Sequence, residues 1–562
     1  MNKNPPSFKE RTMKNTHSRV KTTLFGIALA AGAGLGQAQP VAWDATRNNL
    51  GIGTSTGTTD VTGKGNQAIG GEAGNNVSSD WNLSIGQRAG VNVSGNNANQ
   101  AIGYEAGNNV VGGFNQSFGR SAGRDVTGSY NNAVGFWAGT GVTGSQNTAY
   151  GTNAGRSVTG SNNQSFGLGA GNNVGTNWNI AIGEGAGTNV GGKNANQAIG
   201  YYAGINVNGG WNQSFGRSAG QNVSGNYNNG VGFWAGTDVI GSYNEAYGTN
   251  AGRNVTGSAN QAYGGSAGLN VTGDNNLSMG QNAGNGVFGA SNTAIGLMAG
   301  AEVTGNSNLA LGQAAGGGVR GNQNQALGTA AGQGVTGNAN LAQGASAGQN
   351  VSGGGNIAIG TEAGVYVSAN QTVSLGTAAR ANADNAVAIG SNAHALHANS
   401  VALGAGTATT RGAQVAYAAA GMDDMQSSNG EVALGHRQLT GVAAGSAADD
   451  ATNVGQVQGM VKQGVVSANA YTDQTAQRLS SEMNSTQRRA YAGIAGVAAM
   501  ESAPHIAGKI SYAVGMGTYH SESALGGSLR KTTADGRYSI TAGVAVSSSG
   551  TVGRVALTGV FD

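Results

Sequence analysis

Few residues of this chain are of the types that catalyse reactions or hold metals. Its six histidines are scattered, and none stands in a hydrolase triad or zinc-protease pattern. His394 and His397 are close enough to ring a metal in an assembly of several chains, or they are plain surface residues. Glu72, Glu105 and Glu184 stand alone, whereas a polysaccharide hydrolase needs paired carboxylates. The sequence therefore predicts no enzyme activity and no cofactor.

The elements that position every other residue come from one short unit, repeated from about Asn66 to Val367. The unit reads N-x-A-Φ-G-x-x-A-G-x-x-V-x-G, where Φ is apolar, and it recurs every 16 residues with two spacings of 17. Its first glycine falls at Gly70, Gly86, Gly103 and so on to Gly360. Repeats of this length predict a solenoid in which each coil buries its face against its neighbours.

The columns of the repeat favour short β-strands. The Φ column and a valine column eight residues later, which includes Val77 and Val174, give two apolar positions half a coil apart. We expect the side chains of both columns to point inward. Strands fit this unit better than helices, because helices need apolar residues three and four apart and tolerate few glycines. An asparagine column, which includes Asn66 and Asn163, predicts a ladder of stacked side chains.

Composition supports a narrow rod. Glycine makes up 104 of 562 residues, charged residues 9% and hydrophobic residues 38%, too thin a core for an ordinary globule. Collagen is excluded because glycine does not recur every third residue and there are only 4 prolines. The alternative is an intrinsically disordered chain of low complexity, but the unbroken valine and asparagine columns argue against it. The segment 97–160 nearly repeats as 194–257, which indicates duplication of six coils.

The N-terminus predicts export. Six basic residues precede an apolar run from Leu24 to Leu35 that is too short to span a bilayer, and Gly36-Gln37-Ala38 offers a cleavage site after Ala38. The start is Met1 or Met13. Removing residues 1–38 leaves 22 basic and 24 acidic residues from the original 28 and 25, so the chain's basicity gives no indication of nucleic-acid binding. The absence of cysteine suits passage through an oxidising compartment.

Beyond the rod the sequence changes character. N-A-V-A-I-G at 385–390 and N-S-V-A-L-G at 399–404 lie 14 residues apart, a non-repetitive insert of unassigned role fills 411–430, and R-Q-L-T-G-V-A-A-G and T-N-V-G-Q-V follow within 431–457. These motifs resemble the head repeats and neck of trimeric autotransporter adhesins, the YadA-like family. The resemblance implies a left-handed parallel β-roll head built from three chains, joined by the neck to a three-stranded stalk.

The stalk and the C-terminal anchor are predicted from periodicity. Apolar or small residues from Val454 to Met483 step by 3, 4 and 4, an 11-residue period that predicts a straight or slightly right-handed coiled coil. The alternative is one amphipathic helix on a globule. Residues 506–562 alternate as four strands of about ten residues, as membrane barrel strands do. Four strands cannot form a closed barrel, and open sheet edges are not tolerated in lipid, so three chains are expected to form a 12-stranded barrel. The resemblance implies the same anchor.

Candidate binding residues lie in the variable columns. In four coils the two residues after the first glycine include one or two aromatic side chains. These aromatic residues are the candidate ligand contacts: Tyr104, Phe136, Trp137, Tyr201, Tyr202, Phe233 and Trp234. Interfaces favour aromatic side chains, so these residues either bind a ligand or pack between chains of the trimer. In the anchor, Gly515 and Gly517 are expected to face the pore lumen. The resemblance implies that the head is exported through this pore.

Taken together, the sequence predicts a mainly β protein. The expected parts are a signal peptide (1–38), a cap (39–64), the β-roll head of 16- and 14-residue repeats (65–410), the insert (411–430), the neck (431–457), the coiled-coil stalk (458–490) and the anchor (491–562). The expected function is a homotrimeric adhesin of a Gram-negative outer membrane that binds matrix, glycan or cell-surface ligands or autoaggregates. Its barrel would need the barrel-insertion machinery. The alternative is a passive spacer or coat protein without a ligand.

Overall fold

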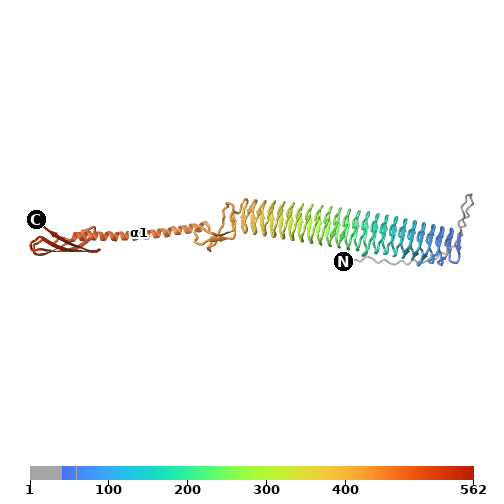
Figure 1. Ribbon diagram of the computed structural model, residues 1–562, viewed down its shortest axis with the longest axis horizontal. Helices are drawn as coiled ribbons and strands as arrows, with labels where there is room; N and C mark the ends of the chain where they lie inside the picture. The colour runs from blue at the N-terminus through green and yellow to red at the C-terminus, as the bar shows by residue number, and fades with distance from the viewer. Residues whose placement is uncertain (1–40, 58–59, 562) are drawn as a thin grey trace, which may run out of the picture. The chain divides into compact units, whose positions relative to one another are not determined.

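The protein forms two units in a computed structural model that describes residues 41–57 and 60–561. The first unit extends to His436 and the second begins at Arg437. The first is a parallel β-solenoid, and the second consists of one helix and a four-stranded sheet (Figure 1). The predicted signal peptide and its cleavage after Ala38 lie outside the described residues.

The solenoid begins with an antiparallel hairpin of β1 (Val41–Asp44) and β2 (Asn49–Ile52). From β2 onward each coil adds one parallel strand to a 25-stranded sheet. The register is one repeat per coil, so that Asn132 lies opposite Thr148. The strands of this sheet that follow β2 are β3 (Gln67–Ile69), β4 (Leu83–Ile85), β6 (Gln100–Ile102), β8 (Gln116–Phe118), β10 (Asn132–Val134), β11 (Thr148–Tyr150), β12 (Gln164–Phe166), β13 (Ile180–Ile182), β14 (Gln197–Ile199), β15 (Gln213–Phe215), β16 (Asn229–Val231), β18 (Glu245–Tyr247), β20 (Gln261–Tyr263), β21 (Leu277–Met279), β22 (Thr293–Ile295), β23 (Leu309–Leu311), β24 (Gln325–Leu327), β25 (Leu341–Gln343), β26 (Ile357–Ile359), β27 (Val373–Leu375), β29 (Val387–Ile389), β31 (Val401–Leu403) and β34 (Val432–Ala433).

A second, interrupted face of the solenoid is built from two-residue strands and isolated bridges, most of which lie in the valine column and the residue after it. These short strands are also parallel. They are β5 (Val93–Ser94), β7 (Val110–Val111), β9 (Val126–Thr127), β17 (Val239–Ile240), β19 (Val255–Thr256), β28 (Arg380–Ala381) and β30 (His394–Ala395).

The core of the solenoid is the valine column, as predicted. Nineteen valines from Val77 to Val367 form one continuous buried cluster, and each is at most 3% exposed. Burial of a valine side chain contributes about 1.5–3 kcal/mol, so the column is a large part of what holds the coils together. Alanines of the repeat, such as Ala68 and Ala73, complete the interior.

The prediction that the Φ column also points inward is wrong. Ile69, Ile182 and Leu311 are 40–42% exposed in the single chain. The buried residue of each three-residue strand in the long sheet is the small residue before Φ, an alanine, a serine or, in β16, Gly230. Side chains alternate along a strand, so a buried centre turns both neighbours outward. The long sheet therefore presents a partly apolar outer face.

The asparagine column forms the predicted ladder inside the solenoid. Asn163 Oδ1 accepts hydrogen bonds from the backbone N–H and the Nδ2 of Asn179, at 2.9 and 2.8 Å. Asn163 Nδ2 donates in turn to Asn147 Oδ1 at 3.1 Å and to the carbonyl of Thr176 at 2.9 Å. Buried polar groups are stable only when paired, and this column pairs them from one coil to the next.

Left-handed backbone marks the corners of each coil. In the coil around Gly135, Tyr130 and Trp137 have φ of 63° and 58°, and Gly141 has φ of 70°. In the 14-residue coils, non-glycine residues have positive φ only at the positions equivalent to Tyr130 and Trp137, as at Asn385 and Asn392. The two extra residues of the longer coil therefore go into a third corner.

The insert 411–430 is extruded between the last two strands of the long sheet. It carries the antiparallel hairpin of β32 (Gln414–Tyr417) and β33 (Gln426–Ser428), after which β34 rejoins β31 in parallel. Val415 and Met425 are exposed on this hairpin in the single chain.

The second unit opens with a tightly bonded segment before the helix. The backbone N–H groups of Ala447 and Ser446 donate to Asp450, which lowers the pKa of that carboxyl. Asn453 then caps α1 (Val454–Ala499) and shares a capping box with Gln456. Gln456 Nε2 also donates to the carbonyl of Gly445 at 2.7 Å, which ties the segment to the first turn of the helix.

Four antiparallel strands follow, as many as predicted, and neighbours in sequence pair in the sheet: β35 (Ile510–Tyr519), β36 (Glu522–Thr532), β37 (Tyr538–Ser547) and β38 (Gly550–Gly559). One face of the sheet is apolar and exposed, as at Tyr512 and Met516. The end of α1 packs on the other face, where Ala495 and Ala499 are buried against β36 and β37. Within residues 41–57 and 60–561, no helix combines the length and apolar character needed to cross a membrane.

Replacing Val174 by Asp should destabilise the solenoid by several kcal/mol, because the side chain is 2% exposed and the new carboxylate would be buried without a partner. Limited proteolysis of the displayed head measures the effect. Asn173→Asp is the matched control, since the equivalent corner positions already hold Asp125 and Asp238. Equal protease resistance of both variants would contradict the inward placement of the valine column.

Candidate ligand surface

Two matching groups of side chains stand out on the solenoid. Stack I comprises Tyr104, Arg120, Phe136, Trp137 and Arg156; stack II comprises Tyr201, Arg217, Phe233, Trp234 and Arg253. Equivalent members are 97 residues apart. The structure thus brings the sequence-predicted aromatic residues together in two separate clusters, each with two arginines that the sequence analysis did not single out.

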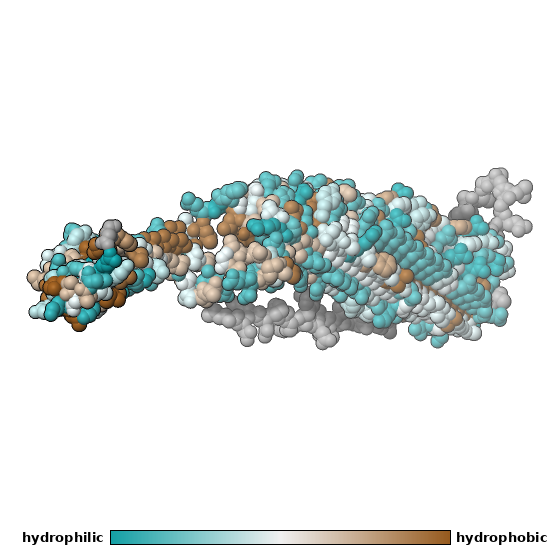
Figure 2. Space-filling model, turned by 60° about the vertical axis from the view of Figure 1, so that its left-hand side comes forward, coloured by the Kyte–Doolittle hydropathy of each residue, from teal (hydrophilic) through white to brown (hydrophobic). Residues whose placement is uncertain are grey.

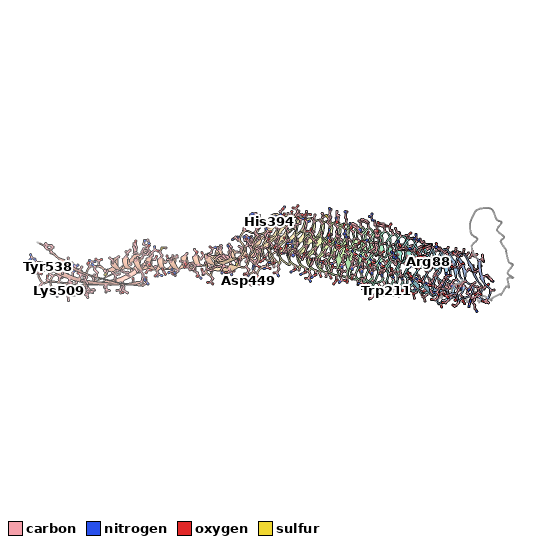
Figure 3. The ribbon with its side chains drawn as sticks, turned by 45° about the vertical axis from the view of Figure 1, so that its right-hand side comes forward. Arg88, Trp211, His394, Asp449, Lys509 and Tyr538 are labelled. Carbon is pink, nitrogen blue, oxygen red and sulfur yellow. The ribbon has the colours of Figure 1, made fainter. Side chains whose placement is uncertain are left out.

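The strands set the spacing within each stack. One column of successive coils holds Tyr104, Arg120 and Phe136, because each stands two residues after the end of its strand, β6, β8 or β10. Parallel strands lie about 4.8 Å apart, which is close to the separation of stacked flat groups. In Figure 3 the side chains of the solenoid stand in rows from coil to coil.

In stack I the guanidinium of Arg120 lies between two rings. Its Cζ is 5.5 Å from the centroid of Tyr104 and 5.4 Å from that of Phe136. The Phe136 and Trp137 rings are stacked at 5.5 Å, and Arg156 lies over Trp137 at 4.9 Å. Cation–π contacts at exposed sites contribute about 0.5–1 kcal/mol each, so the stack holds its members in fixed orientations.

Stack II repeats this geometry. Arg217 lies 5.6 Å from Tyr201 and 5.3 Å from Phe233, and Arg253 lies 4.7 Å from Trp234. Here Tyr202 replaces the acidic residue of the first block, and its ring centroid is 4.3 Å from that of Tyr201. A side-chain hydrogen bond with Tyr202 raises the pKa of Tyr201.

The stack arginines differ from two neighbouring arginines in their pairing. Arg88 and Arg124 both reach Glu105, at 3.0 and 3.5 Å. The four stack arginines lie within 4 Å of no carboxylate among the described residues: Arg120, Arg156, Arg217 and Arg253. In addition, Arg253 Nε is buried and has no hydrogen-bond partner there.

The tryptophans of the stacks occupy strained corners. Trp137 and Trp234 have φ of 58° and 55°, a conformation that bulky residues rarely adopt. The same corner of the next coils holds Asn153 and Asn250, residues that favour it. The coil itself therefore does not require tryptophan at this corner.

A second set of aromatic residues lies, in some coils, at the corner before the buried asparagine. Phe114 and Tyr130 stack at 5.0 Å, and Trp211, Tyr227 and Tyr243 stack in sequence at 5.1 and 5.0 Å. All five are more than 40% exposed in the single chain. Figure 3 places Trp211 at the edge of the solenoid.

The other residues that the sequence analysis named lie elsewhere. His394 is in β30, and His397 Nδ1 is 3.1 Å from Thr409 Oγ1. Among the described residues, no three histidine, cysteine or acidic side chains are grouped as metal ligands. Gly515 is in β35 of the second unit, where an added Cβ would lie 2.7 Å from the carbonyl oxygen of Ala499, and Gly517 is equally close to the helix backbone.

Known proteins match separate parts of the chain. A family model described as the YadA head domain repeat matches twice, at residues 368–393 and 381–407. A stretch of 118 residues, 20% of this chain, is 36% identical to the trimeric autotransporter adhesin AtaA of Acinetobacter sp. (strain Tol 5). Another of 56 residues, 9% of this chain, is 54% identical to the autotransporter adhesin EhaG of Escherichia coli O157:H7.

These stretches of the chain are similar in sequence to the YadA head repeat and to trimeric autotransporter adhesins. The matched stretches span only 3% and 4% of the two adhesins named above. Among solved structures, the collagen-binding domain of the Yersinia adhesin YadA aligns with 40% of this chain and 86% of its own, at 22% identity and a TM-score of 0.21. None of these matches assigns a role to the two stacks.

Changing Phe136, Trp137, Phe233 and Trp234 to Thr-Asn pairs should leave the head folded, because Thr152-Asn153 fills the same corner in the next coil. Each lost stacking or cation–π contact contributes about 1 kcal/mol to stability. Asparagine in place of tryptophan relieves a strain of similar size in the left-handed backbone. We expect an unchanged melting temperature and weaker attachment or autoaggregation of cells that display the variant. A lower melting temperature with attachment per folded molecule unchanged would assign the rings to packing.

Proposed function

We propose that this chain is a homotrimeric surface adhesin, anchored in the outer membrane of a Gram-negative bacterium. Its head would contact host or environmental ligands, or the same head on another cell. The observation that carries the proposal is that the head, the helix and the sheet each leave an apolar surface uncovered in the single chain. Three copies side by side would cover the surfaces of the head and the helix and would pair the edges of the sheet, whose apolar face would then lie against lipid.

The first uncovered surface is the outer face of the long sheet. Its Φ column holds half-exposed apolar residues in almost every coil, and rings stack along it at Tyr150–Phe166 and Tyr247–Tyr263. Contiguous apolar surface of this kind marks an interaction site. It supports packing of three heads through these faces.

The second surface is the apolar stripe of α1. Val457, Val461, Val465 and Leu479 are 45–59% exposed, and they recur at the spacing of the predicted coiled-coil seam. A 46-residue helix of this kind gains most of its stability when its apolar stripe packs against a partner. The stripe therefore supports a three-helix stalk, and hydrophobic patches on the helix and sheet appear in brown in Figure 2.

The third surface is the apolar face of the sheet, together with its two open edges. β35 and β38 lie at the ends of the sheet, and open edges are not tolerated within lipid. Three chains with four strands each would close twelve. The end of α1 lies against the opposite face, where Gly515, Gly517 and Gly526 leave room for its backbone. This supports a pore through which the head is exported and in which the helix then remains.

A passive spacer or coat protein is the second candidate. It is favoured by the mutual stacking of the aromatic rings, since rings that contact one another need no ligand to explain them. The adhesin proposal is supported by the strained backbone of the tryptophan corners and by the relatives' names.

Trimer formation is tested on the full chain in outer membranes. Native mass measurement of the detergent-extracted, unboiled protein should give three chains, because only three copies supply twelve strands. Boiling should convert this species to single chains, since no cysteine links them. A membrane-inserted monomer would refute the proposal.

Gly515→Trp should reduce surface display of the head while signal-peptide cleavage proceeds normally. Even a Cβ at this position would meet the carbonyl of Ala499, and three indoles would lie at one level of the proposed pore. Surface labelling of whole cells measures display. Tyr512→Trp is the control, because Tyr512 is 75% exposed on the opposite face of the same strand. Equal display of the two variants would reject a pore role for this glycine.

A further inference from the structure

We propose that stacks I and II form a paired binding site for a polyanionic glycan, one that carries repeated carboxylate or sulfate groups. The inference rests on the proposed adhesin function and names the chemical class of its ligand. Each stack would bind acidic groups through the edges of its two guanidinium groups and the sugar rings through its aromatic side chains.

The first argument is the geometry of the arginines. In Arg120 and Arg217 both faces of the guanidinium are covered by rings, so its in-plane N–H groups are left for a ligand. A carboxylate or sulfate accepts hydrogen bonds in that plane, and these charge-assisted bonds are about twice as strong as neutral ones. The rings also fix the guanidinium, which reduces the entropy lost on binding.

The second argument is charge. Arg88 pairs with Glu72 and Glu105, and Arg124 pairs with Glu105 and Asp125, whereas the four stack arginines have no carboxylate within 4 Å among the described residues. Arg253 Nε is a buried donor without a hydrogen-bond partner in the described part of the chain. Because no carboxylate of the described residues pairs with the four stack arginines, their charges are left to bind an acidic group of a ligand.

The third argument is what the internal duplication retained. All five stack members are identical in the two blocks. The charged neighbours are not: Glu105, Arg124 and Asp125 of the first block correspond to Tyr202, Gln221 and Asn222. Because the ion-paired residues changed and the stack did not, the stack is the common feature of the two surfaces.

The fourth argument is spacing. The stacks are six coils apart, about 29 Å at one strand spacing per coil, and occupy the same columns of the solenoid. A polymer with regularly repeated acidic groups can bind both at once, and the second contact then gains from a high effective concentration. A small isolated anion gains nothing from this arrangement.

The experiment uses bacteria that display the full chain and three fluorescent probes of similar length: dextran sulfate, polygalacturonate and neutral dextran. The parent should bind one or both anionic polymers and not the neutral one, and the two anionic probes distinguish sulfate from carboxylate. Binding should weaken with added salt because the charges are exposed. Absence of binding to both anionic polymers, or equal binding of neutral dextran, would overturn the inference.

Two matched variants separate the stacks from general charge. Arg120, Arg156, Arg217 and Arg253 are changed together to Gln, and the control changes Arg88, Arg124, Lys193 and Arg320 to Gln, so both lose four positive charges. We expect at least about a tenfold loss of polyanion affinity in the stack variant and less than about twofold in the control. Equal losses would assign binding to net charge and overturn the inference.

A third variant covers the case in which the stack variant is not displayed. Changing the four stack arginines to Lys keeps the charge and removes the planar fork, and affinity should fall by several fold. Parent-like affinity of this variant would refute recognition by the guanidinium edges. Attachment and aggregation of the same cells are measured in parallel. If the parent attaches or aggregates without binding polyanions, the adhesin proposal stands and the glycan inference is refuted. If the parent neither attaches nor aggregates, the adhesin proposal is refuted.

Discussion

The solenoid depends on the hydrogen bonds of its buried asparagine column. Away from the ends of the column, an asparagine side chain accepts from the backbone and the side chain of the next coil and donates back to the previous one, as Asn131 does between Asn115 and Asn147. A single bond of this kind contributes about 1 kcal/mol, but a shift of register would leave buried amides unpaired along the whole column. The ladder therefore fixes the coil length, and the coil length brings side chains 16 residues apart into contact.

Much of this architecture follows from the sequence because a repeat displays its constraints many times. The valine core, the asparagine ladder and the four C-terminal strands were predictable from periodicity alone. The exposure of the Φ column was not, because an apolar residue in a repeat has the same identity whether it faces the core of its own chain or the surface. The deciding signal was the invariably small residue before Φ, such as Ala68 or Ser84, which fits only the crowded interior.

The candidate site was predicted only in part. Its aromatic members are conspicuous in the variable columns, whereas the arginines gain their meaning from a spacing of 16 or 19 residues that becomes contact only once the coils stack. Arg120 and Arg124 look alike in the sequence, yet one lies between rings and the other pairs with Glu105. Only coordinates separate these two environments, because column neighbours belong to different coils.

The direction of the backbone hydrogen bonds has a mechanical consequence. Between coils they run along the axis of the solenoid, from Gln116 to Asn131 and from Asn132 to Asn147 for example. Tension along that axis loads the coils in series, so the end coil yields first and its neighbours stay intact. Each coil that opens releases 16 residues, about 50 Å of extended chain. A head of this design would lengthen stepwise under a sustained pull and dissipate the load coil by coil.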